Sequence, residues 1–178
     1  MTTPFDPIGL WPAATVAILA NGPDMTPELA KSLSQYPTIA VNRAVRHAPW
    51  ADMLLAIDGN WPAEGESFAG LRVVGIESDA DALYVGIPYE VVDMGPLGEL
   101  HLRNNLLAAL RVAARAGAAR IILAGVDVAS YEALHSFPGL AEGLAKLVTE
   151  LAAQGIVVEQ IGAASEPEPV AAKGPARV

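Results

Sequence analysis

The chain has 178 residues, of which 52% are hydrophobic and 17% are charged. This composition is typical of one compact domain with a sizeable core, and it excludes an intrinsically disordered chain. Cysteine is absent, which excludes disulfides, thiolate metal sites and cysteine nucleophiles. The formal net charge of −9 argues against extended contact with nucleic acid, because such contact depends on neutralising phosphates.

The longest apolar runs are of strand length, well short of the ~20 residues of a membrane span. The first residues lack the basic start and long apolar block of a signal peptide. We therefore expect a soluble, cytoplasmic protein with no membrane span. A local basic pocket stays open as an alternative, with six candidate arginines: Arg43, Arg46, Arg103, Arg111, Arg115 and Arg120.

The first 58 residues alternate between continuous apolar runs and short polar connections. Residues 1–14 contain three prolines and are expected to form an N-terminal arm that packs Phe5, Ile8 and Trp11 on the body. The runs that follow predict a strand at 15–20, a helix at about 25–35, a strand at 38–42, a polar turn at 43–50 and a strand at 52–58.

The rest of the chain continues the alternation of strands and helices. Its patterns predict a strand at 71–76, weaker strands at 83–85 and 90–93, a helix at about 100–116, a strand at 120–125, a helix at about 140–155 and a strand at 156–161. Residues 162–178 are rich in Ala, Pro and Glu and are expected to form a disordered C-terminal tail. Residues 15–161 are therefore predicted to form a single α/β domain, with a mostly parallel sheet and helices on both faces. The order of the strands between 70 and 95 stays open.

The turn Asn21-Gly22-Pro23 joins the first predicted strand to the first predicted helix. An open parallel sheet places ligands at such a turn. Asn tolerates left-handed backbone and offers an amide, Gly22 lets a ligand approach the main chain, and Pro23 stiffens the turn. A tight strand-to-helix connection without a ligand explains the same residues. Asp24 is predicted to cap the helix that follows.

Polar residues also follow the other predicted strands. Asn42 and Arg43 follow the second strand, Asp58 ends the third, and Asp127 follows the strand at 120–125. Because the carboxyl ends of parallel strands meet at one edge, we expect these side chains to lie along the same edge as Asn21. Asx residues that merely satisfy turns are the alternative.

Asn104 and Asn105 lie near the start of the helix predicted at 100–116, which would bring two more amides to the same edge. Amides suit a nucleobase, a ribose or a sugar, because they offer a donor and an acceptor without a charge to desolvate. Several such residues at one edge therefore favour a binding site over isolated turns.

His135 is the histidine best placed to act as an acid or base, eight residues after Asp127 in the loop before the last predicted helix. A solvated loop histidine is the alternative. Histidines and carboxylates do not occur with metal-ligand spacing, so no metal site is predicted; Asp79 and Asp81 are expected to lie in a solvated turn.

Five segments resemble in order the pattern of small Rossmann-like proteins of phages and prophages: 20–24, 40–44, 48–52, 56–58 and 125–127. Those proteins are similar to archaeal 6-hydroxymethylpterin diphosphokinases and, more distantly, to the family 42 sialyltransferases. The resemblance covers residues 15–161 and is strongest over 15–58. It implies a single Rossmann-like domain, a phage or prophage origin, and a nucleotide or nucleotide-sugar ligand, with a CMP-type nucleotide suggested by the sialyltransferases.

By motif match, the resemblance implies that Asn21, Gly22 and Asn42 contact a CMP-linked donor and that His135 is the general base. The family usually has Asn-Ser-Gly at the start of the helix before the last motif, where this chain has Asn104-Asn105-Leu106. A Ser-Gly pair offers a hydroxyl and open backbone amides to a phosphate, whereas Asn and Leu narrow the approach.

Two functions follow from these observations. The first is a nucleotide-dependent transferase of the glycosyl- or diphospho-transferase type, whose partner is a small-molecule nucleotide or nucleotide sugar. The second is a catalytically inactive phage accessory or structural protein that keeps the fold and binds another protein, such as a phage protein, through its arm or its acidic face. A phage-encoded protein would act in the host cytoplasm, or in the virion if it is structural.

Overall fold

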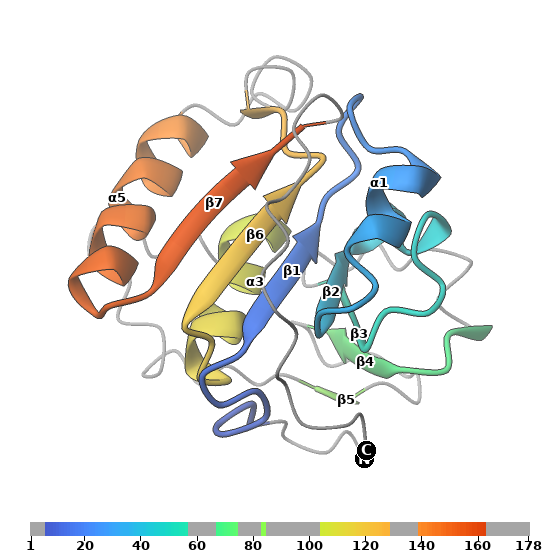
Figure 1. Ribbon diagram of the computed structural model, residues 1–178, viewed down its shortest axis with the longest axis horizontal. Helices are drawn as coiled ribbons and strands as arrows, with labels where there is room; N and C mark the ends of the chain where they lie inside the picture. The colour runs from blue at the N-terminus through green and yellow to red at the C-terminus, as the bar shows by residue number, and fades with distance from the viewer. Residues whose placement is uncertain (1–5, 57–66, 75–82, 85–103, 129–138, 163–178) are drawn as a thin grey trace.

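The computed structural model describes residues 6–56, 67–74, 83–84, 104–128 and 139–162 (Figure 1). These ranges contain a seven-stranded sheet in the order β5-β4-β3-β2-β1-β6-β7, in which every neighbouring pair is parallel. The strands are β1 (Thr15–Leu19), β2 (Thr38–Val41), β3 (Met53–Ala56), β4 (Leu71–Val74), β5 (Leu83–Tyr84), β6 (Arg120–Ala124) and β7 (Val157–Ile161). The helices are α1 (Pro27–Ser32), the 3₁₀ helix η1 (Asn42–Arg46), α3 (Asn105–Arg115) and α5 (Leu140–Ala153).

The two faces of the sheet carry separate apolar layers. Val16 and Ile18 of β1 pack in one layer with α3 and α5, whereas Ala17 and Leu19 pack in the other with α1 and η1. Successive side chains of a strand point to opposite faces, so the continuous apolar runs of β1, β2, β3 and β6 supply both layers. The structure is therefore a Rossmann-like α/β fold with helices on both faces, as the sequence predicts.

The path of the chain across the sheet reverses at β1. From β1 the chain runs outward through β2, β3, β4 and β5, and it then returns through α3 to β6 on the other side of β1 (Figure 1). The connection that leaves β1 enters α1 on one face of the sheet, whereas α5, the helix after β6, packs on the opposite face. The carboxyl ends of β1 and β6 thus form the topological switch point of the sheet.

The predicted elements agree with the described residues in type and approximate bounds. The prediction of a polar turn at 43–50 is wrong in part. The segment begins as η1, and it packs back onto the sheet, so Ala44, Val45 and Ala48 are buried in the apolar layer that contains α1. The positions of β4 and β5 in the sheet could not be predicted from the sequence. They lie at the outer edge, beyond β3. The strand predicted at 90–93 lies outside the described residues.

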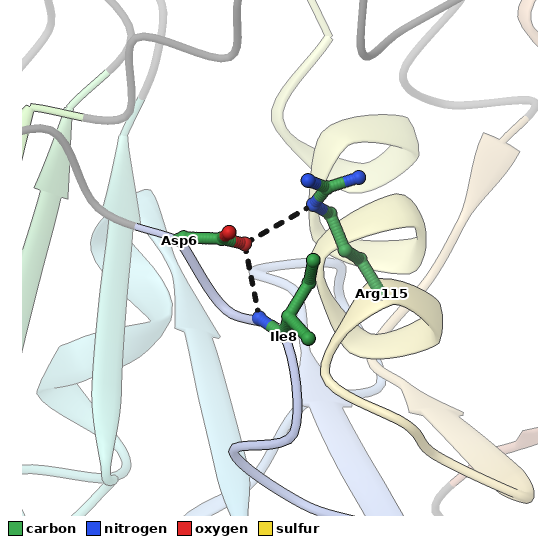
Figure 2. A network of polar contacts seen from close by, with 3 residues as sticks. All are labelled: Asp6, Ile8 and Arg115. Atoms are coloured by element: carbon green, nitrogen blue, oxygen red, sulfur yellow. Dashed lines mark hydrogen bonds and ion pairs between the residues drawn. The ribbon is translucent and has the colours of Figure 1, made fainter.

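The N-terminal arm docks where α3 ends. The N–H of Trp11 donates to the carbonyl of Ala116 at 2.8 Å, and the Trp11 side chain packs, partly buried, against the α3 layer. Asp6 accepts hydrogen bonds from the Ile8 N–H at 3.1 Å and from the Arg115 guanidinium at 3.3 Å (Figure 2). The prediction that Ile8 packs on the body is wrong, because Ile8 is 63% exposed. Phe5 and the tail at 163–178 lie outside the described residues.

Candidate functional site

The carboxyl edge of the sheet gathers most of the candidate side chains that the structure describes. Asn21 follows β1, Asn42 follows β2, and Asp127 lies three residues after the end of β6. These strands are parallel neighbours in the order β2-β1-β6, so the three residues lie along one edge. Asp58, which is expected beside them at this edge, and His135, the candidate base, lie outside the described residues.

The turn after β1 packs directly on the turn after β6. The N–H of Ala20 donates to the carbonyl of Ala124 at 2.8 Å, and the N–H of Gly22 donates to the carbonyl of Gly125 at 2.7 Å. A Cβ atom at Gly22 would collide with that Gly125 oxygen. The glycine is therefore required by the neighbouring turn, which fills the side of Gly22 where a ligand was expected to approach.

Gly125 is constrained from two directions as well. Its φ of +67° is a left-handed conformation, which glycine adopts without the steric cost of a side chain. A Cβ there would lie 2.5 Å from the carbonyl oxygen of Ala20 and 2.8 Å from side-chain atoms of the buried Met25. The two turns and Met25 consequently form one close-packed unit at the switch point.

Asn42 has an unusual backbone conformation for a residue with a side chain. Its φ is +50°, in the left-handed region that asparagine tolerates better than most residues. It is partly buried and opens η1, and within the described residues its amide has no hydrogen-bond partner. Arg43, the next residue, is exposed. The β2 end of the edge therefore carries an amide and a guanidinium in adjacent positions.

Asn104 and Asn105 also lie at this edge, because α3 ends beside the start of β6 and runs antiparallel to it. The Asn104 Oδ1 accepts hydrogen bonds from the N–H groups of Leu106 at 2.9 Å and Leu107 at 3.1 Å. Asn104 is thus the N-cap of its own helix, and it satisfies two donors that an anion would otherwise use. Both asparagines are buried, with 2% and 5% exposure. The first turn of α3 is accordingly occupied by its own cap.

The cap of α1 is Thr26, not Asp24 as the sequence suggested. The Thr26 Oγ1 accepts from the Leu29 N–H at 3.1 Å, and the helix begins at Pro27. Pro23 and Asp24 are both exposed. Asp24 keeps its carboxylate near Gly162, since its Oδ2 lies 3.8 Å from the position of a Cβ atom there. A carboxylate that is not used in capping therefore stands at the carboxyl edge.

Gln160 belongs to the same edge, and no sequence pattern points to it. Its Nε2 donates to the carbonyl oxygen of Val126 at 2.9 Å, which links β7 to the turn after β6. A lone glutamine in a strand carries no motif. The alignment of β7 with β6, which places Gln160 opposite Leu123, is the information needed to find it.

Among the arginines that the structure describes, the candidate basic pocket is not assembled. Arg111 pairs with Glu150 at 3.1 Å between α3 and α5, and Arg115 pairs with Asp6 on the arm. Arg120, the first residue of β6, makes two hydrogen bonds to Glu159 in the middle of β7. Arg115 and Arg120 thus lie at the end of the sheet opposite Arg43, and Arg103 lies outside the described residues.

The described part of the chain contains no group of three or more His, Asp or Glu side chains arranged to hold a metal ion. Nor does any helix within the described ranges have the length and apolar character to cross a membrane. No family model matches the chain, and no curated protein or solved structure matches it either.

Proposed function

We propose that this chain binds a nucleotide or nucleotide sugar at the carboxyl edge of its sheet, as a transferase of the glycosyl- or diphospho-transferase type. The observation that supports this most is the switch point at β1 and β6, where the connections depart to opposite faces. Open α/β sheets bind their ligands at such points. Asn21 and Asp127 flank this point, and Asn42 stands at the next strand.

Different side chains at this edge suit different parts of a nucleotide. The amides of Asn21 and Asn42 suit the base or the sugar, because each offers a donor and an acceptor. Asp127 suits a ribose hydroxyl, and Arg43 suits a phosphate. The capped first turn of α3 makes Arg43 the better phosphate contact of the two. The more distant similarity to the family 42 sialyltransferases favours a CMP-type nucleotide and His135 as the base.

A catalytically inactive phage accessory protein is the second candidate, and two observations favour it. Asn104 occupies the amides of α3 that related proteins are expected to offer to a phosphate. Asp24 adds an exposed carboxylate at the same edge, which repels an anion at short range. Such a protein would retain the fold and bind a protein partner instead of a nucleotide.

Calorimetric titration of the full chain with CMP, a CMP-linked sugar, UDP and ATP distinguishes the two candidates. Nucleotide binding with a Kd below the millimolar range supports the proposal, and transfer or hydrolysis that His135→Ala abolishes supports the enzyme. If none of the four ligands binds at millimolar concentration, the proposal is wrong and the accessory-protein function takes its place. Binding without turnover would leave a nucleotide-binding protein that is not a transferase.

A further inference from the structure

The turn Gly125-Val126-Asp127 is held from both sides after it leaves the β6 ladder. The ladder between β6 and β7 ends at Ala124, which pairs with Ile161. Beyond that point, Gly22 donates its N–H to the Gly125 carbonyl from the β1 side. From the β7 side, the Gln160 amide donates to the Val126 carbonyl at 2.9 Å.

The position of these two bonds determines what they control. They act on consecutive carbonyl groups, and the next residue along the chain is Asp127. The backbone nitrogen of Asp127 lies 3.2 Å from the position of a Cβ atom at Gly22, and the Gly22 N–H donates to the Gly125 carbonyl, so the two turns are in direct contact. A change at Gln160 is therefore transmitted to Asp127 and to the Asn21-Gly22 turn.

We infer that Gln160 is a positioning residue for the switch-point site, which fixes the Gly125–Asp127 turn and, through it, the Asn21-Gly22 turn. The part of this inference that concerns a ligand rests on the proposed function. The part that concerns the backbone does not, because a hydrogen bond between Gln160 and Val126 orders the turn with or without a ligand. The donor group of Gln160 is the feature that matters, since the carbonyl it contacts can only accept.

Amide hydrogen exchange of the unliganded full chain, followed by NMR, tests the backbone part. The reporter is the Gly22 amide, which loses its protection when the turn moves away, and the Ile122 amide in the middle of β6 reports global opening. Gln160→Leu keeps the volume and removes the donor, whereas Gln160→Lys restores a donor at similar reach. The matched control is Gln154→Leu, an exposed glutamine at the end of α5.

We expect Gln160→Leu to accelerate exchange at Gly22 about two- to tenfold, the range that corresponds to one net hydrogen bond, with Ile122 unchanged. Gln160→Lys should return the rate to that of the wild type, and Gln154→Leu should not change it. An unchanged Gly22 rate in Gln160→Leu overturns the inference. An equal acceleration at Gly22 and Ile122 also overturns it, because that result shows a general loss of stability.

Titration with CMP separates this inference from the proposed function. If the wild type binds CMP, Gln160→Leu should raise its Kd severalfold and Gln160→Lys should restore it; an unchanged Kd removes Gln160 from the site. If the wild type binds no nucleotide while the Gly22 amide responds as expected, the proposed function is wrong and Gln160 still positions the two turns.

Discussion

The carbonyl oxygen of Gly125 accepts the N–H of Gly22 at 2.7 Å, and the same oxygen occupies the space that a side chain at Gly22 would need. The same oxygen therefore accepts the hydrogen bond and leaves no room for a side chain at position 22. The two glycines come from turns far apart in the sequence, and together they set how closely the chain packs at the switch point.

Replacing Gly22 with alanine should destabilise the fold by about 1–3 kcal/mol, the usual cost of forcing extra volume into a packed site. The obstruction is a backbone carbonyl, which cannot move aside without breaking its own hydrogen bond. Urea unfolding monitored by tryptophan fluorescence measures the change. Gly162→Ala is the matched control at the same edge, because among the described residues its Cβ would meet only the Asp24 carboxylate, at 3.8 Å. Equal stabilities of the two variants would contradict this account of the turn.

The fold could be predicted because each buried strand is recognisable from its own residues. The runs that become β1, β2, β3 and β6 are apolar at successive positions and only four or five residues long, as expected for strands covered on both faces. The helical stripe from Leu106 to Ala114 and the Gly117 that follows it are equally local signals. These elements need no knowledge of what they pack against.

The site was less predictable because its defining contacts join distant residues. Asn21 and Asn42 could be assigned to one edge from strand polarity alone, but the collision between Gly22 and Gly125 depends on the alignment of β1 with β6. The contact between Gln160 and the turn after β6 depends likewise on the alignment of β7 with β6. The choice between Asp24 and Thr26 as the cap of α1 depends on where the turn ends, which sequence patterns locate only to within a few residues.

The N-terminal arm should contribute to stability through Trp11 and hardly at all through its ion pair. Trp11→Ala removes a large, partly buried side chain from the α3 layer and should cost about 2 kcal/mol, less than a fully buried tryptophan. Asp6→Ala breaks a contact with Arg115 in which the Asp6 side chain is 61% exposed, so its effect should stay within about 0.5 kcal/mol. Thermal unfolding of the two variants, each compared with the wild type, measures both. A larger effect for Asp6→Ala than for Trp11→Ala would reverse this assignment.

Arg120 should not be replaceable by lysine without loss. Its Nε and Nη2 each donate to a different carboxylate oxygen of Glu159, and the Arg120 side chain is 20% exposed. Lysine keeps the charge but cannot make the paired contact, so Arg120→Lys should lower stability by about 0.5–1 kcal/mol. Denaturant titration measures this, with Lys146→Arg, an exposed position on α5, as a control for a general effect of exchanging the two residue types. Full stability in Arg120→Lys would show that the charge alone is sufficient.

Asn42 offers a way to separate backbone strain from ligand recognition. Its φ of +50° suits asparagine and glycine but not alanine, so Asn42→Ala should destabilise the unliganded protein by about 1 kcal/mol while Asn42→Gly leaves it nearly unchanged.

Both variants remove the amide. If the amide contacts a bound nucleotide, Asn42→Gly should weaken binding by about 1–3 kcal/mol, because a polar ligand atom is left without its partner. Calorimetry of Asn42→Gly with CMP, beside denaturant unfolding of both variants, measures the two effects separately. Wild-type affinity in Asn42→Gly would remove Asn42 from the site, and equal stability of the two unliganded variants would show that the left-handed backbone imposes no constraint.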